Sequence, residues 1–168
     1  MFKQDDPFFP DDINRAGCNL FSLLALCEVE SETCTFFTKE QVLDVYHLGI
    51  STRFTDWQGN QRTWIEKNCS VVSPDAIAAA AFNLLGSKKK ALQVGQIDKN
   101  GKPTYWDWAN KKPYNNPEYI LLEFPIKGEF SGHYVLADPM HNVLFDPSSH
   151  NYTNRPIKGG LLYKVIGG

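Results

Sequence analysis

The sequence lacks long hydrophobic runs, a strong net charge and paired cysteines. No segment approaches the roughly 18 consecutive apolar residues that a membrane-spanning helix needs. Lys and Arg number 17 and Asp and Glu number 19, so the formal net charge is only −2. The one basic run, at 88–90, follows a predicted helix, where cations suit the helix dipole. We therefore expect a protein that neither spans a membrane nor binds nucleic acid.

The start of the chain lacks the pattern of a secretory signal peptide. Residues 1–12 are acidic and interrupted by two prolines, whereas a signal peptide has a basic start and an apolar centre. A cytoplasmic protein is therefore expected. The four cysteines form no C-x-x-C pair, which disfavours a zinc ribbon or a thioredoxin motif, and no cofactor is expected. Each cysteine must either fill the core or carry chemistry.

The first half of the chain predicts helices. After an extended, turn-rich lead-in at 1–17, apolar residues at helical spacing indicate a buried helix over 18–30. Thr38 and Gln41 have the spacing of a capping box and predict a second helix after Thr38. Ser73, Pro74 and Gly86 mark the start and end of a third. Residues 51–69 are polar and show no clear period.

The second half predicts strands. Short runs of β-branched and aromatic residues, separated by Gly, Pro and Asn, lie at 91–97, 119–126, 132–138, 142–146 and 160–166. Helices followed by strands favour an α+β fold, in which N-terminal helices pack on a C-terminal antiparallel sheet of about five strands. The length of 168 residues suits a single domain over 1–168. Trp106 and Trp108, in the long connection 99–117, either line a peptide-binding groove or complete a thin core.

One cysteine and one histidine occupy positions suited to nucleophilic catalysis. Acyl transfer by cysteine needs a thiolate, a base for its proton and hydrogen-bond donors for the oxyanion. Cys18 alone follows a glycine at the start of a predicted helix, where unpaired N–H groups favour a thiolate. His133 opens a predicted strand that could face that helix terminus. The alternatives are a Cys18 that only fills the core and a buried His133 bonded to a backbone carbonyl.

Asp146 is the candidate partner of His133. It ends the strand that follows the strand of His133, thirteen residues further along the chain. If residues 138–141 form a turn, antiparallel pairing of the two strands returns Asp146 to the end where His133 lies. The competing interpretation is that Asp146 only forms a turn before Pro147.

Three motifs together resemble a known family. The segment G-C-N-L-F-S-L-L opens a buried helix, G-H-Y-V-L opens a strand, and the next strand ends in F-D-P. This order resembles the papain-like cysteine peptidase superfamily, and within it small bacterial peptidases that cut double-glycine leaders. The resemblance implies a papain-like fold, a Cys-His-Asp triad of Cys18, His133 and Asp146, and a hydrolase that cleaves a peptide or peptidoglycan stem.

The chain departs from the family at one position. The family usually carries a glutamine about six residues before the cysteine, and its side-chain amide helps to form the oxyanion hole. That spacing falls on Asp12 here, and a carboxylate cannot donate a hydrogen bond. Asn14 is the expected substitute, with Gln4 as a second candidate if the lead-in folds back. The backbone N–H of Cys18 would be the other donor.

Other functions remain open at this stage. The same thioester chemistry would serve a glutamine deamidase or transamidase. A protein without catalytic activity that binds a peptide or partner in the same cleft would explain the missing upstream glutamine. The side chains of His133, Asp138, His141 and Asp146 are of types that bind divalent metals, but no rigid spacing pairs two of them. The oligomeric state is not predicted.

Overall fold

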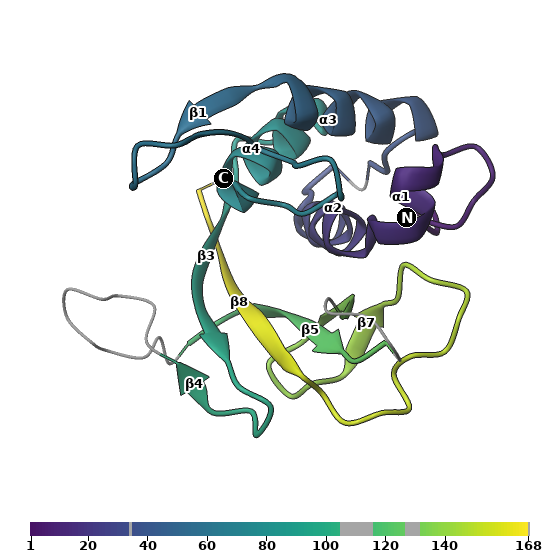
Figure 1. Ribbon diagram of the computed structural model, residues 1–168, viewed down its shortest axis with the longest axis vertical. Coiled ribbons are helices and arrows are strands. Elements are labelled where there is room, and N and C mark those ends of the chain that lie inside the picture. The colour runs from purple at the N-terminus through teal and green to yellow at the C-terminus, as the bar shows by residue number, and fades with distance from the viewer. Residues whose placement is uncertain (34, 105–115, 127–131, 168) are drawn as a thin grey trace.

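The computed structural model describes residues 1–33, 35–104, 116–126 and 132–167, and it has two layers (Figure 1). Helices from the first half of the chain lie on one side, and an antiparallel sheet from the second half lies on the other. The predicted α+β architecture is therefore confirmed. Within the described ranges the sheet has six strands instead of about five. The additional strand, β4 (Pro103–Thr104), is too short to be predicted from its pattern.

Helix α2 (Cys18–Glu30) lies between the other helices and the sheet. It packs against strands of the sheet on one side and against α4 on the other, so nearly every face is covered. This explains why its sequence is apolar throughout and shows little amphipathic pattern. The buried residues of α2 include Leu20, Phe21, Leu23, Leu24 and Leu26, all completely inaccessible to solvent. The helix that carries the candidate nucleophile is thus part of the main hydrophobic core.

The remaining helices surround α2. Helix α3 (Lys39–Ser51) begins with the predicted capping box, in which Thr38 and Gln41 each bond the other's backbone N–H. Helix α4 (Pro74–Leu84) begins at the predicted proline, although the Ser73 side chain makes no capping bond. Gly86 follows α4 with a φ of +72°, a conformation that glycine adopts without strain.

The lead-in contains a helix that the sequence analysis did not predict. Helix α1 (Asp11–Ala16) follows Pro10 and has two acidic residues in its first turn and Arg15 in its last. These charges suit the helix dipole, but six residues are too few to give a periodic apolar pattern. The prediction of an extended segment over 1–17 was therefore wrong for residues 11–16. Further along, strands β1 (Arg53–Thr55) and β2 (Gln61–Thr63) form a small antiparallel hairpin.

The main sheet has the strand order β4-β3-β8-β5-β6-β7, and all neighbouring strands are antiparallel. Its longer strands are β3 (Lys90–Ile97), β5 (Tyr119–Phe124), β6 (His133–Ala137) and β8 (Gly159–Ile166). The short strand β7 (Val143–Phe145) forms the edge beyond β6. This order places β5 and β6 side by side, with the start of β6 paired to the end of β5.

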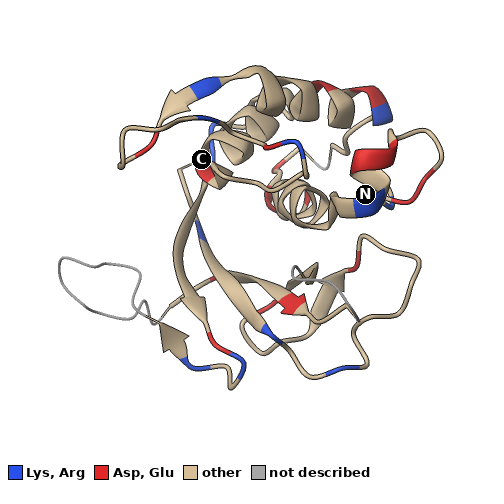
Figure 2. Cartoon of the chain, viewed as in Figure 1, with Lys and Arg blue, Asp and Glu red and all other residues tan. Residues whose placement is uncertain are grey.

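Both faces of the sheet carry buried side chains. One face contributes Leu121, Leu136 and Tyr163 to the main core beneath the helices. The other face has its own apolar cluster, against which Tyr152 and Ile157 of the β7–β8 connection pack. None of the helices in the described part of the chain is long and apolar enough to cross a membrane. In the view of Figure 2, Lys and Arg are interspersed with Asp and Glu over both layers.

The central position of α2 predicts where the fold is most sensitive. Leu24 of α2 is completely buried, whereas Leu48 of α3 is 43% exposed. We expect Leu24→Ala to lower the free energy of unfolding by about 2–5 kcal/mol, because it removes buried methyl groups and leaves a cavity. The matched change Leu48→Ala should cost about 1 kcal/mol or less. Urea denaturation of both variants checks this, and equal losses would contradict a core centred on α2.

Candidate active site

Cys18 lies at the first residue of α2, where the chain bends between two helices. Helix α1 ends as the N–H of Gly17 donates to the carbonyl oxygen of Ile13 at 2.8 Å. A Cβ atom at Gly17 would lie 2.7 Å from that same oxygen, so only glycine fits this bend. Cys18 is 7% exposed, and its Sγ donates to the carbonyl oxygen of Gly132 at 3.8 Å. The thiol of this helix start therefore faces the beginning of β6.

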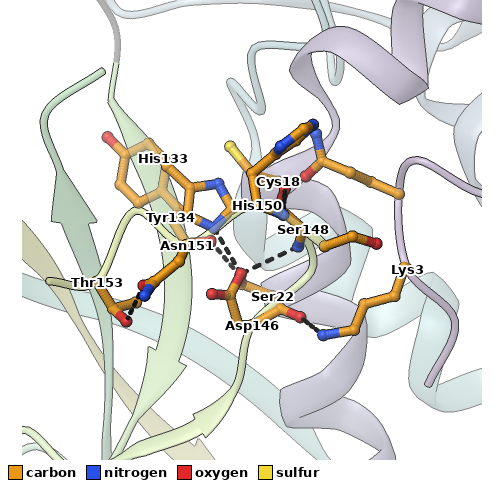
Figure 3. A network of polar contacts seen from close by, with 12 residues as sticks. Lys3, Cys18, Ser22, His133, Tyr134, Asp146, Ser148, His150, Asn151 and Thr153 are labelled. Carbon is orange, nitrogen blue, oxygen red and sulfur yellow. Dashed lines mark hydrogen bonds and ion pairs between the residues drawn. The ribbon is translucent and has the colours of Figure 1, made fainter. Parts of the chain in front are cut away.

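His133 is the first residue of β6 and is 1% exposed. Its Nε2 lies 2.6 Å from Oδ1 of Asp146, and its side chain also interacts with the thiol of Cys18. The ring of Tyr152 covers the imidazole, with 4.9 Å between the two ring centroids. Figure 3 shows the imidazole between the sulfur of Cys18 and the carboxylate of Asp146. The structure thus brings together the three residues that the sequence analysis selected for a triad.

The β6–β7 hairpin returns Asp146 to His133, as the strand spacing predicts. Strand β6 ends before Asp138. The N–H of Asp138 donates to the carbonyl oxygen of Asn142 at 3.0 Å, and β7 begins at the residue after Asn142. Asp146 follows β7. Its Oδ1 also accepts the backbone N–H of Ser148 at 3.0 Å, which orients the carboxylate toward the imidazole.

The surroundings of the pair favour a protonated His133. Burial opposes the positive charge, but the hydrogen bonds to Asp146 and Cys18 outweigh it and raise the pKa of His133 to about 9. Burial works against the charge of Asp146 as well, yet the bonds from His133 and Ser148 keep the pKa of Asp146 below its usual value. Because the pKa of His133 lies above the ordinary 6.5, its proton stabilises the fold fully below about pH 6.5. That contribution is lost as the pH rises through about 9.

The N-terminal segment folds back onto the loop that carries Asp146. Lys3 Nζ donates to the carbonyl oxygen of Asp146, and the N–H of Gln4 donates to the carbonyl oxygen of Pro147 at 2.8 Å. The carboxylate of Asp5 accepts the backbone N–H and the hydroxyl of Ser149, at 2.9 and 3.0 Å. Residues 3–5 therefore hold the 146–149 loop in place. Sequence analysis missed this role because nothing in the pattern links residues more than 140 positions apart.

Asn14 and Gln4 are bonded to each other. The Nδ2 of Asn14 donates to the carbonyl oxygens of Gln4 and Asp6, at 2.6 and 3.0 Å. Both amide hydrogens of Asn14 are thus used within the folded lead-in, which leaves none for an oxyanion. Gln4 is 5% exposed, and its Nε2 donates to the carbonyl oxygen of Asn14 at 3.1 Å, one helical turn before Cys18. That nitrogen carries a second hydrogen, while the Oε1 of Gln4 is buried without a partner among the described residues.

The other described cysteines sit in different environments. Cys27, inside α2, donates to the carbonyl oxygen of Ala78, and burial raises the pKa of its thiol far above the usual range. Burial also raises the pKa of Cys69, to about 11, although a hydrogen bond from Tyr46 opposes the shift. Neither thiol has a histidine partner in these contacts. Cys34 lies outside the described residues.

The metal-binding alternative finds no geometric support. Asp138 and His141 lie in the β6–β7 turn, where the Asp138 carboxylate accepts the backbone N–H groups of Met140 and Asn142. Across the described ranges, no three His, Cys, Asp or Glu side chains are grouped as a metal ion would require. Trp106 and Trp108, the candidate walls of a peptide groove, lie outside the described residues.

The chain was compared with models of protein families, with curated proteins and with solved structures, and none of them matched. The papain-like resemblance therefore remains an expectation from the three sequence motifs.

The contact between His133 and Asp146 predicts the titration of the imidazole. We expect NMR to show His133 titrating near pH 9 in the wild type. In Asp146→Asn the pKa should fall by about 1–3 pH units, because the negative charge that stabilises the imidazolium is lost. Asp138→Asn removes the same charge from the same hairpin without touching His133 and should leave the titration unchanged. Equal titration in the wild type and Asp146→Asn would contradict the pairing.

Proposed function

We propose that this protein is a cysteine peptidase-like hydrolase that cleaves an amide bond through a thioester on Cys18. The proposal is supported mainly by one observation, the position of His133 between the thiol of Cys18 and the carboxylate of Asp146. Cys18 begins α2, His133 begins β6 and Asp146 directly follows β7, so three separate parts of the chain meet here. A Cys18 that only filled the core would need neither a buried histidine nor a carboxylate behind it.

The reaction follows from the proton positions. His133 accepts the proton of Cys18, and the thiolate attacks the substrate carbonyl carbon, forming a C–S bond and an oxyanion. When the oxyanion collapses, the C–N bond breaks and the imidazolium gives its proton to the leaving amine. His133 then takes a proton from water, which attacks the thioester carbonyl. The C–S bond breaks, the acid product leaves and the thiol is restored.

Gln4 takes the place of the missing upstream glutamine in this proposal. Its side-chain nitrogen is held against the carbonyl oxygen of Asn14 and has one hydrogen left for the oxyanion. The backbone N–H of Cys18, at the start of α2, is the second donor. The sequence analysis favoured Asn14 for this role. Asn14 instead binds the backbone carbonyls of Gln4 and Asp6 and so fixes the main chain of the lead-in. With Gln4 in this role, the missing upstream glutamine is a weaker reason to regard the protein as non-catalytic.

The proposed substrate is a peptide or a peptidoglycan stem, because both present an accessible amide carbonyl. The cytoplasmic location expected from the sequence suits a nucleophile that must stay reduced. A glutamine deamidase or transamidase would use the same thioester with ammonia as the leaving group. Product analysis distinguishes these reactions, since only a peptidase separates its substrate into two fragments.

Alkylation with iodoacetamide tests the thiolate directly. At about pH 6 ordinary thiols are almost fully protonated, so a cysteine paired with an imidazolium should react selectively. We expect mass spectrometry of the digested protein to show Cys18 alkylated well ahead of Cys27 and Cys69. His133→Ala should remove that advantage.

The two buried cysteines are internal controls within the same molecule. If Cys18 reacts no faster than they do, or reacts equally fast in the wild type and His133→Ala, the catalytic proposal fails. The protein would then be better regarded as a binding domain.

Gln4 can be tested separately from the nucleophile. Gln4→Met keeps the length of the side chain but removes the donor, so amide hydrolysis should slow by about 10²–10³-fold. Alkylation of Cys18 should keep its wild-type rate, because displacement of iodide forms no oxyanion. Gln58→Met, in the turn between β1 and β2, is the control and should change neither rate. Unchanged hydrolysis in Gln4→Met would exclude Gln4 from the oxyanion hole.

A further inference from the structure

Glu123 is a partly buried carboxylate on β5 that meets the start of β6 beside the candidate nucleophile. Its side chain is 17% exposed, and its Oε1 accepts the backbone N–H of Gly132 at 2.9 Å. The carbonyl oxygen of the same Gly132 accepts the thiol of Cys18. Gly132 therefore links the Glu123 carboxylate to the Cys18 thiol: its N–H donates to the carboxylate, and its carbonyl oxygen accepts from the thiol.

The contact between Glu123 and Gly132 is too close for any other residue at position 132. A Cβ atom there would lie 2.5 Å from Cγ of Glu123 and 2.6 Å from the carbonyl oxygen of Phe124. Real Cβ atoms do not approach other atoms so closely. The glycine before His133 is thus explained by the close approach of both the Phe124 backbone and the Glu123 side chain. No positive φ is involved.

Two further groups fix the Glu123 carboxylate. Lys158 Nζ lies 3.3 Å from its Oε1, and the backbone N–H of Lys158 donates to the Glu123 carbonyl oxygen at 2.7 Å. Tyr134, which is paired with Glu123 across the two strands, interacts with the carboxylate through its side chain. A carboxylate held by the side chains of Lys158 and Tyr134 has less freedom, so the Gly132 backbone that it binds is fixed as well.

We propose that Glu123 is a positioning residue of this site, which holds the backbone of Gly132 so that its carbonyl faces Cys18 and His133 begins β6 beside the thiol. The inference rests on the proposed function, because it concerns the placement of the same nucleophile and base. Glu123 does not touch the sulfur or the imidazole and acts only through Gly132. Its role depends on a hydrogen-bond acceptor at this place more than on a negative charge.

Two substitutions separate position from charge. Glu123→Ala removes the acceptor, and we expect the rate of Cys18 alkylation at about pH 6 to fall by about tenfold. Glu123→Gln keeps an oxygen that accepts the Gly132 N–H, and it should retain the wild-type rate within about threefold. Glu118→Ala is the matched control, because Glu118 accepts the backbone N–H of Val165 at 2.8 Å near the opposite end of β5. It should leave alkylation of Cys18 unchanged.

Hydrogen exchange at the Gly132 amide provides a readout that does not depend on catalysis. We expect protection of this amide in the wild type and Glu123→Gln and fast exchange in Glu123→Ala. Unchanged exchange in Glu123→Ala, or a loss of alkylation in Glu123→Gln as large as in Glu123→Ala, would overturn the inference. If exchange changes as expected while wild-type Cys18 is unreactive, the positioning by Glu123 stands and the proposed function fails.

Discussion

The hydrogen bond between the buried His133 and the partly buried Asp146 is the contact on which the candidate site depends. It joins the first residue of β6 to the residue after β7, with 2.6 Å between Nε2 and Oδ1. Because Nε2 is occupied by Asp146, the other ring nitrogen is the one left for Cys18. The hairpin thus sets both the orientation of the imidazole and its charge. Helix α2 supplies the thiol from the opposite layer. The burial of α2 in the core holds that thiol in place beside the start of β6.

Burying such a pair is costly unless further polar groups support it. The support comes from three parts of the chain. Ser148 donates its N–H to the carboxylate, the folded-back lead-in binds the backbone around Asp146, and Glu123 fixes the glycine before His133. Removing one partner of a buried pair would leave an uncompensated charge, which is why the surrounding bonds matter for stability as well as for reactivity. The site and the fold are in this respect built from the same contacts.

Sequence reasoning predicted the parts of the site that depend on local pattern. The apolar run after Cys18, the capping box at Thr38 and the short β-branched runs each identified an element. The turn expected at 138–141 then placed Asp146 near His133. It missed α1, whose six residues carry no periodic signal. It also missed the contacts of Asp5 and Glu123, because these depend on which loops and strands become neighbours. Gln4 was a second candidate for the oxyanion hole on the condition that the lead-in folds back, and the lead-in does fold back.

The central claim is that His133 accepts the proton of Cys18, which gives a thiolate and an imidazolium. The most direct measurement is the ultraviolet absorbance of the thiolate, recorded as a pH titration of the wild type minus Cys18→Ser. The account predicts that the thiolate absorbance from Cys18 is larger in the wild type than in His133→Ala at the same pH, because an imidazolium stabilises the negative charge. If the difference absorbance follows the same pH curve in both proteins, the two residues form no ion pair and the account is contradicted.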